Sequence, residues 1–292
     1  MEILIEIVIY GSIHSITLAL MALGFALVYG TSRVPNFAHG ALYIINGFIV
    51  WGFLRAWGLH YFLSIVLAIM ATGVIGALIY QFIMIRVRGM AISEIIASYA
   101  IGLAILEALR WGGFKGMTYT LPTFIEGTVF IAGVPVDLHR IIVLVCGIAL
   151  VGFLWFFTHF TRIGLALRGM AQDERAALML GIDSDRIAVV AMVFGSMLAG
   201  LAAVLLLPLG NIVVETGYNV LILAIAVCVV GGLGSWMGAV LAALLIGFAQ
   251  ILTEVYLGTH FKMVVALLAI IITLILKPSG LFGRQKELEE RV

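Results

Sequence analysis

The chain consists of long apolar runs separated by short polar segments. A membrane-spanning helix needs about 20 predominantly apolar residues, and most of the nine runs reach or approach that length. They cover residues 3–29, 36–56, 60–85, 91–110, 139–160, 185–208, 219–232, 236–257 and 261–276. The pattern predicts an all-α, polytopic transmembrane helix bundle of about eight or nine spans, in one domain over residues 1–292.

Two of these runs are interrupted at one end. Run 36–56 begins directly after a break between Gly30 and Asn36, and run 219–232 ends in the sequence Gly-Gly-Leu-Gly-Ser at 231–235. Either run could form a half-helix or a re-entrant segment. Broken backbone at membrane depth is tolerated only where protein or a water-filled cavity satisfies its polar groups. Both breaks are therefore candidates for a transport path.

Composition excludes a water-soluble protein. The chain is 64% hydrophobic and 11% charged, and its mean hydropathy is +1.23. Cys146 and Cys228 fall inside apolar runs, so we expect neither a disulfide nor a metal site. The N-terminus carries Glu2 and Glu6 but no basic residue, so we interpret it as the first span, not a cleavable signal. The sequence contains no stripe of basic and aromatic residues, so we do not expect it to bind nucleic acid.

Segment 161–183 is charged and lies between two spans. Basic and acidic residues alternate there with apolar ones, which is the pattern of a short amphipathic helix. Asp173 and Glu174 suit its first turn, where the helix dipole favours negative charge, and Gly181 suits a left-handed C-terminal residue. The segment could dock into a partner. The alternatives are an interfacial helix on lipid headgroups or a solvated loop.

Basic residues predict the orientation, because Lys and Arg are retained on the cytoplasmic side. With nine spans and the N-terminus outside, eleven of the 16 basic residues fall inside. The inner set is Arg33, Arg86, Arg88, Arg162, Arg168, Arg175, Arg186, Lys277, Arg284, Lys286 and Arg291, and the outer set is Arg55, Arg110, Lys115, Arg140 and Lys262. Segment 161–183 and the tail are then cytoplasmic, and loop 111–138 faces outward. We also expect Asn211, Glu215 and Asn219 to lie in a solvated outer loop.

A polar face begins the second run. Asn36, His39, Gly40, Tyr43 and Gly47 recur at helical spacing, with Asn46 slightly off the stripe. Asn and His would leave hydrogen-bonding groups unsatisfied in lipid, so this face should turn toward protein or a pore. We predict that Asn36, His39, Tyr43 and Asn46 line a translocation path. Hydrogen bonding that only joins helices is the alternative for each of them.

Catalytic signatures are absent from the sequence. There is no G-x-x-x-x-G-K-[ST] loop, no G-x-S-x-G elbow and no H-E-x-x-H pair, so the chain is not expected to be an enzyme. Ion-coupled transport would favour ionisable residues deep inside spans. Glu94, Glu107 and Glu254 lie toward span ends. A stand-alone ion-coupled carrier or channel is therefore the second hypothesis, and a structural scaffold is the third.

Three separated motifs carry a family resemblance. They are Asn-Phe-Ala-His-Gly at 36–40, Arg-Gly-Met-Ala-Gln-Asp at 168–173 leading to Leu-Gly-Ile at 180–182, and Gly-Gly-Leu-Gly-Ser at 231–235; the tail Lys-Pro-Ser-Gly-Leu-Phe-Gly at 277–283 adds a fourth. In this order the chain resembles the permease subunits of bacterial branched-chain amino-acid ABC importers over nearly its whole length.

The resemblance implies an inner-membrane permease that moves a small solute, by default a branched-chain amino acid, from periplasm to cytoplasm. It implies a second related permease, two ATPase subunits carrying ATP and Mg, and a periplasmic solute-binding protein as partners, besides membrane lipid. It also implies that the stretch from Gln172 to Gly181 is the cytoplasmic coupling helix, with Asp173, Glu174 and Arg175 as contact residues.

Two positions depart from the family pattern. Gly169 stands where many members carry Ala, and it should loosen the helix by about 1 kcal/mol, so we expect the coupling helix to begin after it. Glu94 stands where an apolar residue is expected.

Overall fold

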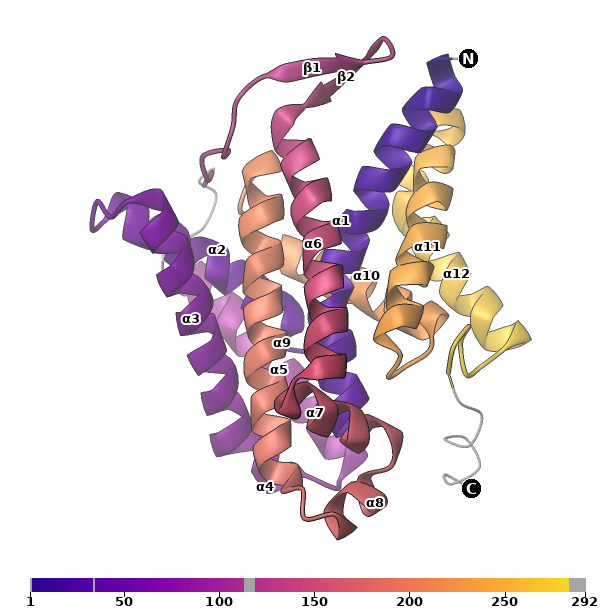
Figure 1. The fold of residues 1–292 in the computed structure, drawn as a ribbon. Coiled ribbons are helices and arrows are strands. Elements are labelled where there is room, and N and C mark those ends of the chain that lie inside the picture. The colour runs from indigo at the N-terminus through magenta and orange to yellow at the C-terminus, as the bar shows by residue number, and fades with distance from the viewer. Residues whose placement is uncertain (1, 34, 113–118, 284–292) are drawn as a thin grey trace. The chain divides into compact units, whose positions relative to one another are not determined.

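The structure, a computed structural model, describes residues 2–33, 35–112 and 119–283, so Lys115, Arg284, Lys286 and Arg291 lie outside the described residues. Figure 1 shows the chain folded into long helices with one small hairpin. Two compact units are distinguished. Unit 1 contains residues 1–26, 123–154 and 222–292, and unit 2 contains 27–122 and 155–221.

The described elements follow in chain order. The first half holds α1 (Glu2–Ser32), α2 (His39–Arg55), α3 (Tyr61–Ile79), the π-helical turn η1 (Tyr80–Met84), α4 (Ile85–Val87) and α5 (Ala91–Trp111), then strands β1 (Thr128–Ile131) and β2 (Val134–Asp137). The second half holds α6 (Leu138–Phe160), α7 (Arg162–Gln172), α8 (Glu174–Met179), α9 (Ser184–Leu206), η2 (Leu207–Leu209), α10 (Thr216–Gly231), α11 (Trp236–Leu257), η3 (Thr259–Phe261) and α12 (Lys262–Leu276).

Every apolar run predicted from the sequence forms a helix. Within the described ranges, seven helices are long and apolar enough to cross a membrane, and α10 is a shorter apolar helix. The seven are Ile3–Ser32, Tyr61–Val87, Ala91–Trp111, Leu138–Phe160, Ser184–Leu209, Trp236–Leu257 and Thr259–Leu276. With α10 these make eight apolar helices, in agreement with the predicted eight or nine spans. The two runs that fall short, 36–56 and 219–232, are those whose ends the sequence breaks.

Helix α2 forms the centre of unit 2. It packs against α3, α5 and α9, and most of its residues are buried. Close approach depends on glycine: a Cβ on Gly40 would overlap the backbone of Gly217, and a Cβ on Gly76 of α3 would overlap the Ser196 side chain of α9. A 17-residue helix enclosed by protein need not be as long as the bilayer is thick.

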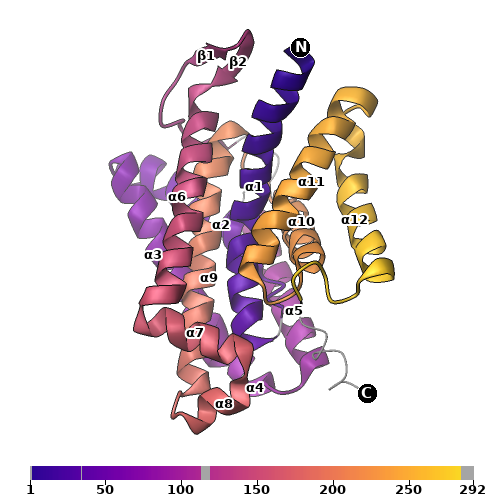
Figure 2. The same ribbon diagram turned by 45° about the vertical axis from the view of Figure 1, so that its right-hand side comes forward.

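Unit 1 is built on α1, α11 and α12. Figure 2 shows α11 and α12 lying side by side. A Cβ on Gly247 of α11 would overlap Ser15 of α1, so these two backbones pack closely. The β1–β2 hairpin departs from the predicted all-helical pattern. It is antiparallel, with Ile131 opposite Val134.

The hairpin is attached to α1 through its second strand. Val134 and Val136 are buried against Ile13, and the Tyr10 hydroxyl donates to the Pro135 carbonyl at 2.6 Å. Strand β1 is exposed along its length.

Two of the sequence motifs meet in unit 1. The tail N–H groups of Leu281 and Phe282 donate to the Val230 and Gly231 carbonyls, at 2.9 and 3.0 Å. These carbonyls end α10, so the tail satisfies acceptors that a helix C-terminus leaves open. A Cβ on Gly232, where φ is +101°, would overlap Gly283. The 231–235 break and the 277–283 tail therefore form one interlocked unit.

Candidate functional site

Helix α7 anchors the charged segment to unit 2. Thr161 caps its first turn by accepting a 3.0 Å hydrogen bond from the Gly164 N–H. Leu167 is buried with Phe157 of α6 and Ala191 of α9. Helix α7 continues through Gly169 to Gln172. The glycine therefore does not end the helix, because the buried face holds it in place.

Helix α8 is a separate short helix with both ends capped. Asp173 is extended, and its carboxylate accepts a 3.0 Å hydrogen bond from the Ala176 N–H, while Glu174 occupies the first turn. At the other end Gly181 has φ +81°. Its N–H donates to Leu178 O at 2.9 Å and the Ile182 N–H donates to Ala177 O at 3.1 Å, which is a Schellman ending. The end signals read from the sequence are confirmed, but the helix is shorter than Gln172 to Gly181.

The outer surface of α8 combines polar and apolar groups. Gln172, Asp173, Arg175 and Gly181 are exposed. Met179 and Leu180 are 87% and 82% exposed. Two exposed apolar side chains next to each other at the end of the α7–α8 segment are unusual. Large apolar groups that do not face lipid are normally covered by another protein surface.

Glu174 points back into the protein. Its carboxylate pairs with Arg88 at 3.1 Å, and Arg88 also pairs with Asp185 and donates to the Ser184 hydroxyl at 2.9 Å. Arg33 donates to the Ala171 carbonyl at 3.3 Å, near the end of α7. No pattern in the sequence indicated Arg88 as a partner of α8, since 86 residues separate Arg88 from Glu174.

Charge is uneven between the two ends of unit 2. The end carrying α7 and α8 also carries the described arginines of the α1–α2 and α4–α5 connections and the start of α9, namely Arg33, Arg86, Arg88, Arg162, Arg168, Arg175 and Arg186. At the other end α2 finishes at Arg55, and α5 finishes beside Arg110. Retention of basic residues on the cytoplasmic side favours a cytoplasmic α7–α8 end.

The predicted path residues are all buried in unit 2. Asn36, His39 and Tyr43 are 3%, 1% and 2% exposed. Asn36 precedes α2: its carbonyl oxygen Oδ1 accepts from the Ala38 N–H at 3.0 Å, and its Nδ2 donates to Met192 Sδ at 3.3 Å. The polar face therefore turns away from lipid, as predicted.

Asn46 joins helices. Its amide donates to the Thr72 hydroxyl of α3 at 2.9 Å, and a Cβ on Gly200 of α9 would overlap it. This contact is the interhelical hydrogen bonding that was the alternative for Asn46. Its Oδ1 has no hydrogen-bond partner among the described residues, and its role on a path stays a prediction.

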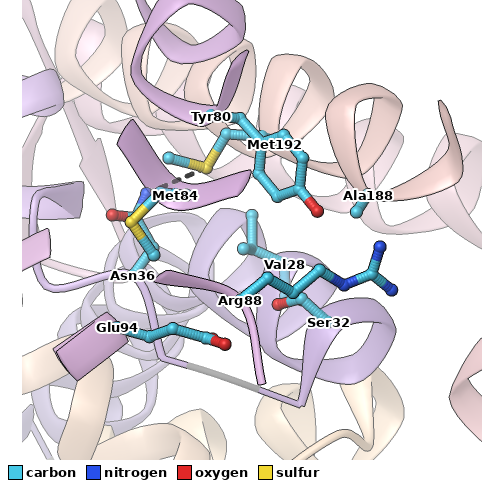
Figure 3. A pocket seen from close by; sticks show the side chains of 9 residues that line it. All are labelled: Val28, Ser32, Asn36, Tyr80, Met84, Arg88, Glu94, Ala188 and Met192. Atoms are coloured by element: carbon cyan, nitrogen blue, oxygen red, sulfur yellow. Dashed lines mark hydrogen bonds between the residues drawn. The ribbon is translucent and has the colours of Figure 1, made fainter. Parts of the chain in front are cut away.

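A small cavity lies beside Asn36 in unit 2. Its volume is about 30 Å³, far below the roughly 300–1,000 Å³ of ligand pockets. Figure 3 shows the side chains around it, which include Tyr80 and Met84 of η1, Arg88, Glu94 and Met192. It has room for about one or two waters, but not for an organic solute.

The three acids considered for ion coupling all have partners. Glu94 accepts a 2.5 Å hydrogen bond from the Gly89 N–H and so fixes the turn before α5. Glu107 pairs with Arg110 at 2.5 Å, and Glu254 pairs with Lys262. This hydrogen bond to the Gly89 N–H explains why an acid stands at position 94, where the family pattern has an apolar residue.

The loop before α10 is less solvated than predicted. Asn211 and Glu215 are exposed, but Ile212 and Val214 between them are buried. The Ile212 N–H donates to Tyr119 O at 2.8 Å. The loop is therefore packed, and Glu215 also pairs with Arg110 at 2.7 Å.

Similarity to a solved structure supports the fold. The chain is similar to PsaBC from Streptococcus pneumoniae in complex with Fab, with a TM-score of 0.50, 13% identity, and coverage of 97% of this chain and 94% of that one. The likeness extends over nearly the whole of both chains and supports the same polytopic helical fold.

Sequence comparison identifies the family. The model for the branched-chain amino acid transport system, permease component, matches residues 7–275. The chain is 31% identical to the branched-chain amino acid permease protein BraD of Pseudomonas aeruginosa, covering 92% of each chain. It is 29% identical to LivH of Escherichia coli, covering 92% of each, and 29% identical to the probable LivH of Methanocaldococcus jannaschii, covering 93% of this chain and 90% of that one. The chain belongs to this permease family and is a multi-pass membrane subunit of an ABC transport system.

Proposed function

We propose that this permease moves a branched-chain amino acid from the periplasm across the inner membrane, driven by ATP and Mg bound on partner subunits. The substrate class rests on the family description and on the names of BraD and LivH. The permease core is completed by a second, related permease. Two ATPase subunits and a solute-binding protein complete the importer.

The observation that carries the coupling role is the exposed tip of α8. Two capped ends hold a six-residue helix in a defined conformation. Met179 and Leu180 project from it, and Gln172, Asp173 and Arg175 surround it with polar groups. An apolar core with a polar rim is the usual composition of a protein interface. We assign its partner as an ATPase subunit on the cytoplasmic side.

The small cavity supports transport by alternating access. No organic solute fits a space of about 30 Å³, so in this account Asn36, His39 and Tyr43 contact the solute only after helices of the bundle move. A permease of this kind needs different contacts in two states, with the specificity supplied by the soluble receptor.

The proposal is tested by leucine uptake into proteoliposomes that contain the complete importer, with ATP inside and the loaded binding protein outside. Gly181→Glu should abolish stimulation of the ATPase and uptake while the subunits still assemble, because it places charge and a strained backbone at the end of α8. Gly58→Glu is the matched control. Gly58 also has positive φ, +62°, and open space around it, but it follows α2 at the other end of unit 2. Parental uptake by Gly181→Glu would contradict the coupling role.

A further inference from the structure

Arg88 lies where the charged segment meets the spanning helices. It follows the continuous helical stretch formed by α3, η1 and α4. Its Nη2 contacts Glu174 of α8 and the Ser184 hydroxyl, and its Nη1 contacts Asp185, so the guanidinium bridges α8 and the start of α9. Arginine suits this position, because its planar group can donate to several acceptors at once.

The helix that leads to Arg88 changes from α-helical to π-helical geometry shortly before that residue. From Tyr80 to Met84 it adopts a π-helical turn, a feature that often occurs at functional sites and kinks. Tyr80 and Met84 line the small cavity with Arg88 (Figure 3). The cavity gives the side chains of this turn room to move, which a close-packed interior would not.

On the N-terminal side of the π-helical turn, α3 packs tightly against its neighbouring helices. A Cβ on Gly73 would overlap Met197, and a Cβ on Gly76 would overlap Ser196, so α3 and α9 pack closely. Asn46 then joins α2 to α3 through Thr72. A displacement of Arg88 therefore acts on α3 and α9 together, and these two helices enclose the polar helix α2.

We propose that Arg88 is the positioning residue that transmits motion of α8 to the spanning helices, with the Tyr80–Met84 turn as the hinge. The proposal rests on the coupling role of α8 proposed above. Arg88 contacts no solute and no nucleotide in this account. It acts by holding Glu174 and Asp185 in a fixed relation.

The test measures leucine uptake and ATP hydrolysis together in the reconstituted importer. Arg88→Ala should lower the uptake per ATP hydrolysed by about tenfold, within the usual range of coupling effects, while the ATPase subunits still co-purify. Arg88→Lys should retain an intermediate ratio, since lysine keeps the charge but cannot engage both carboxylates in the same geometry. Arg186→Ala is the matched control, because Arg186 lies at the same end, is 85% exposed and pairs with Asp183.

A double-variant comparison separates transmission from general damage. If Arg88 and Glu174 act through each other, Arg88→Ala with Glu174→Ala should be within about twofold of the worse single variant, whereas independent effects would multiply. Three results would overturn the proposal: an unchanged ratio in Arg88→Ala, multiplying effects, or loss of the ATPase subunits, which would mean that Arg88 only keeps α8 folded. Gly181→Glu, measured alongside, reports on α8 itself. If Gly181→Glu retains the parental ratio of uptake to ATP hydrolysis, the proposed coupling role of α8 is wrong. If Gly181→Glu lowers this ratio and Arg88→Ala does not, only the proposed role of Arg88 is wrong.

Discussion

The side-chain amide of Asn46 donates a 2.9 Å hydrogen bond to the hydroxyl of Thr72, and both residues are fully buried. This bond ties α2 to α3 at the centre of unit 2. Thr72→Val should therefore destabilise the protein by about 1–3 kcal/mol, because it leaves the Asn46 amide buried without its acceptor. The thermal unfolding midpoint of the purified importer should therefore fall. An unchanged midpoint would show that the bond contributes nothing to packing.

Two glycines of the charged segment should respond in opposite ways to alanine. Gly181 has φ +81°, so Gly181→Ala should destabilise the end of α8 by about 1–2 kcal/mol. Gly169 lies inside α7, and its Cβ would only touch Ile182 at 3.9 Å, so Gly169→Ala should stabilise α7 by roughly 0.5–1 kcal/mol. Hydrogen exchange measures both effects locally.

Amides over 174–182 should exchange roughly 5- to 30-fold faster in Gly181→Ala. Amides of α7 should exchange no faster in Gly169→Ala. If the amides over 174–182 exchange equally slowly in the two variants, the left-handed ending of α8 is not needed for the stability of that helix.

The interlock of the tail with α10 should be sensitive to a single methyl group. Gly232 and Gly258 share a φ of +101°, but a Cβ on Gly232 would overlap Gly283, whereas nothing lies within 4 Å of one on Gly258. Gly232→Ala should therefore lower the thermal midpoint more than Gly258→Ala, by an extra cost of about 1–3 kcal/mol for overpacking. Equal losses would attribute the whole effect to backbone strain and would argue against a tight interlock.

Sequence patterns predicted the helices well because burial in a bilayer requires long apolar runs. The two runs with broken ends form the shorter helices α2 and α10. The length that a helix needs depends on whether lipid or protein surrounds it. The packing of Gly40 against Gly217, which encloses α2, joins residues far apart in the chain.

The ends of α8 were also predictable, since Asp173 and Gly181 act through local backbone geometry. The Arg88 contacts were not. An ion pair between residues 86 positions apart leaves no periodic signal, and a surface arginine near a span end is expected from membrane orientation alone. The sequence was enough to assign Asn46 to the protein interior. Its hydrogen bond to Thr72 could be identified only from the packing of α2 against α3.

Neutralising two acids should separate ATP-driven from ion-coupled transport. Glu107 and Glu254 each pair with a neighbouring basic side chain, which is a structural contact. Glu107→Gln and Glu254→Gln should therefore retain at least about half of the parental uptake, since partly exposed ion pairs contribute little. A protonophore should not affect uptake into proteoliposomes supplied with ATP. Loss of uptake in either variant, or on dissipating the proton gradient, would favour the carrier hypothesis.

Thiol cross-linking at α8 tests the central claim most directly. Met179→Cys places a thiol on the 87%-exposed tip, and Trp111→Cys places one on a 90%-exposed residue at the end of α5, at the other end of unit 2. In the assembled importer, a short bifunctional maleimide should join Met179→Cys to an ATPase subunit, with a yield that changes when nucleotide binds, and should not join Trp111→Cys. Absence of that product from Met179→Cys in an importer that still transports leucine would contradict the account.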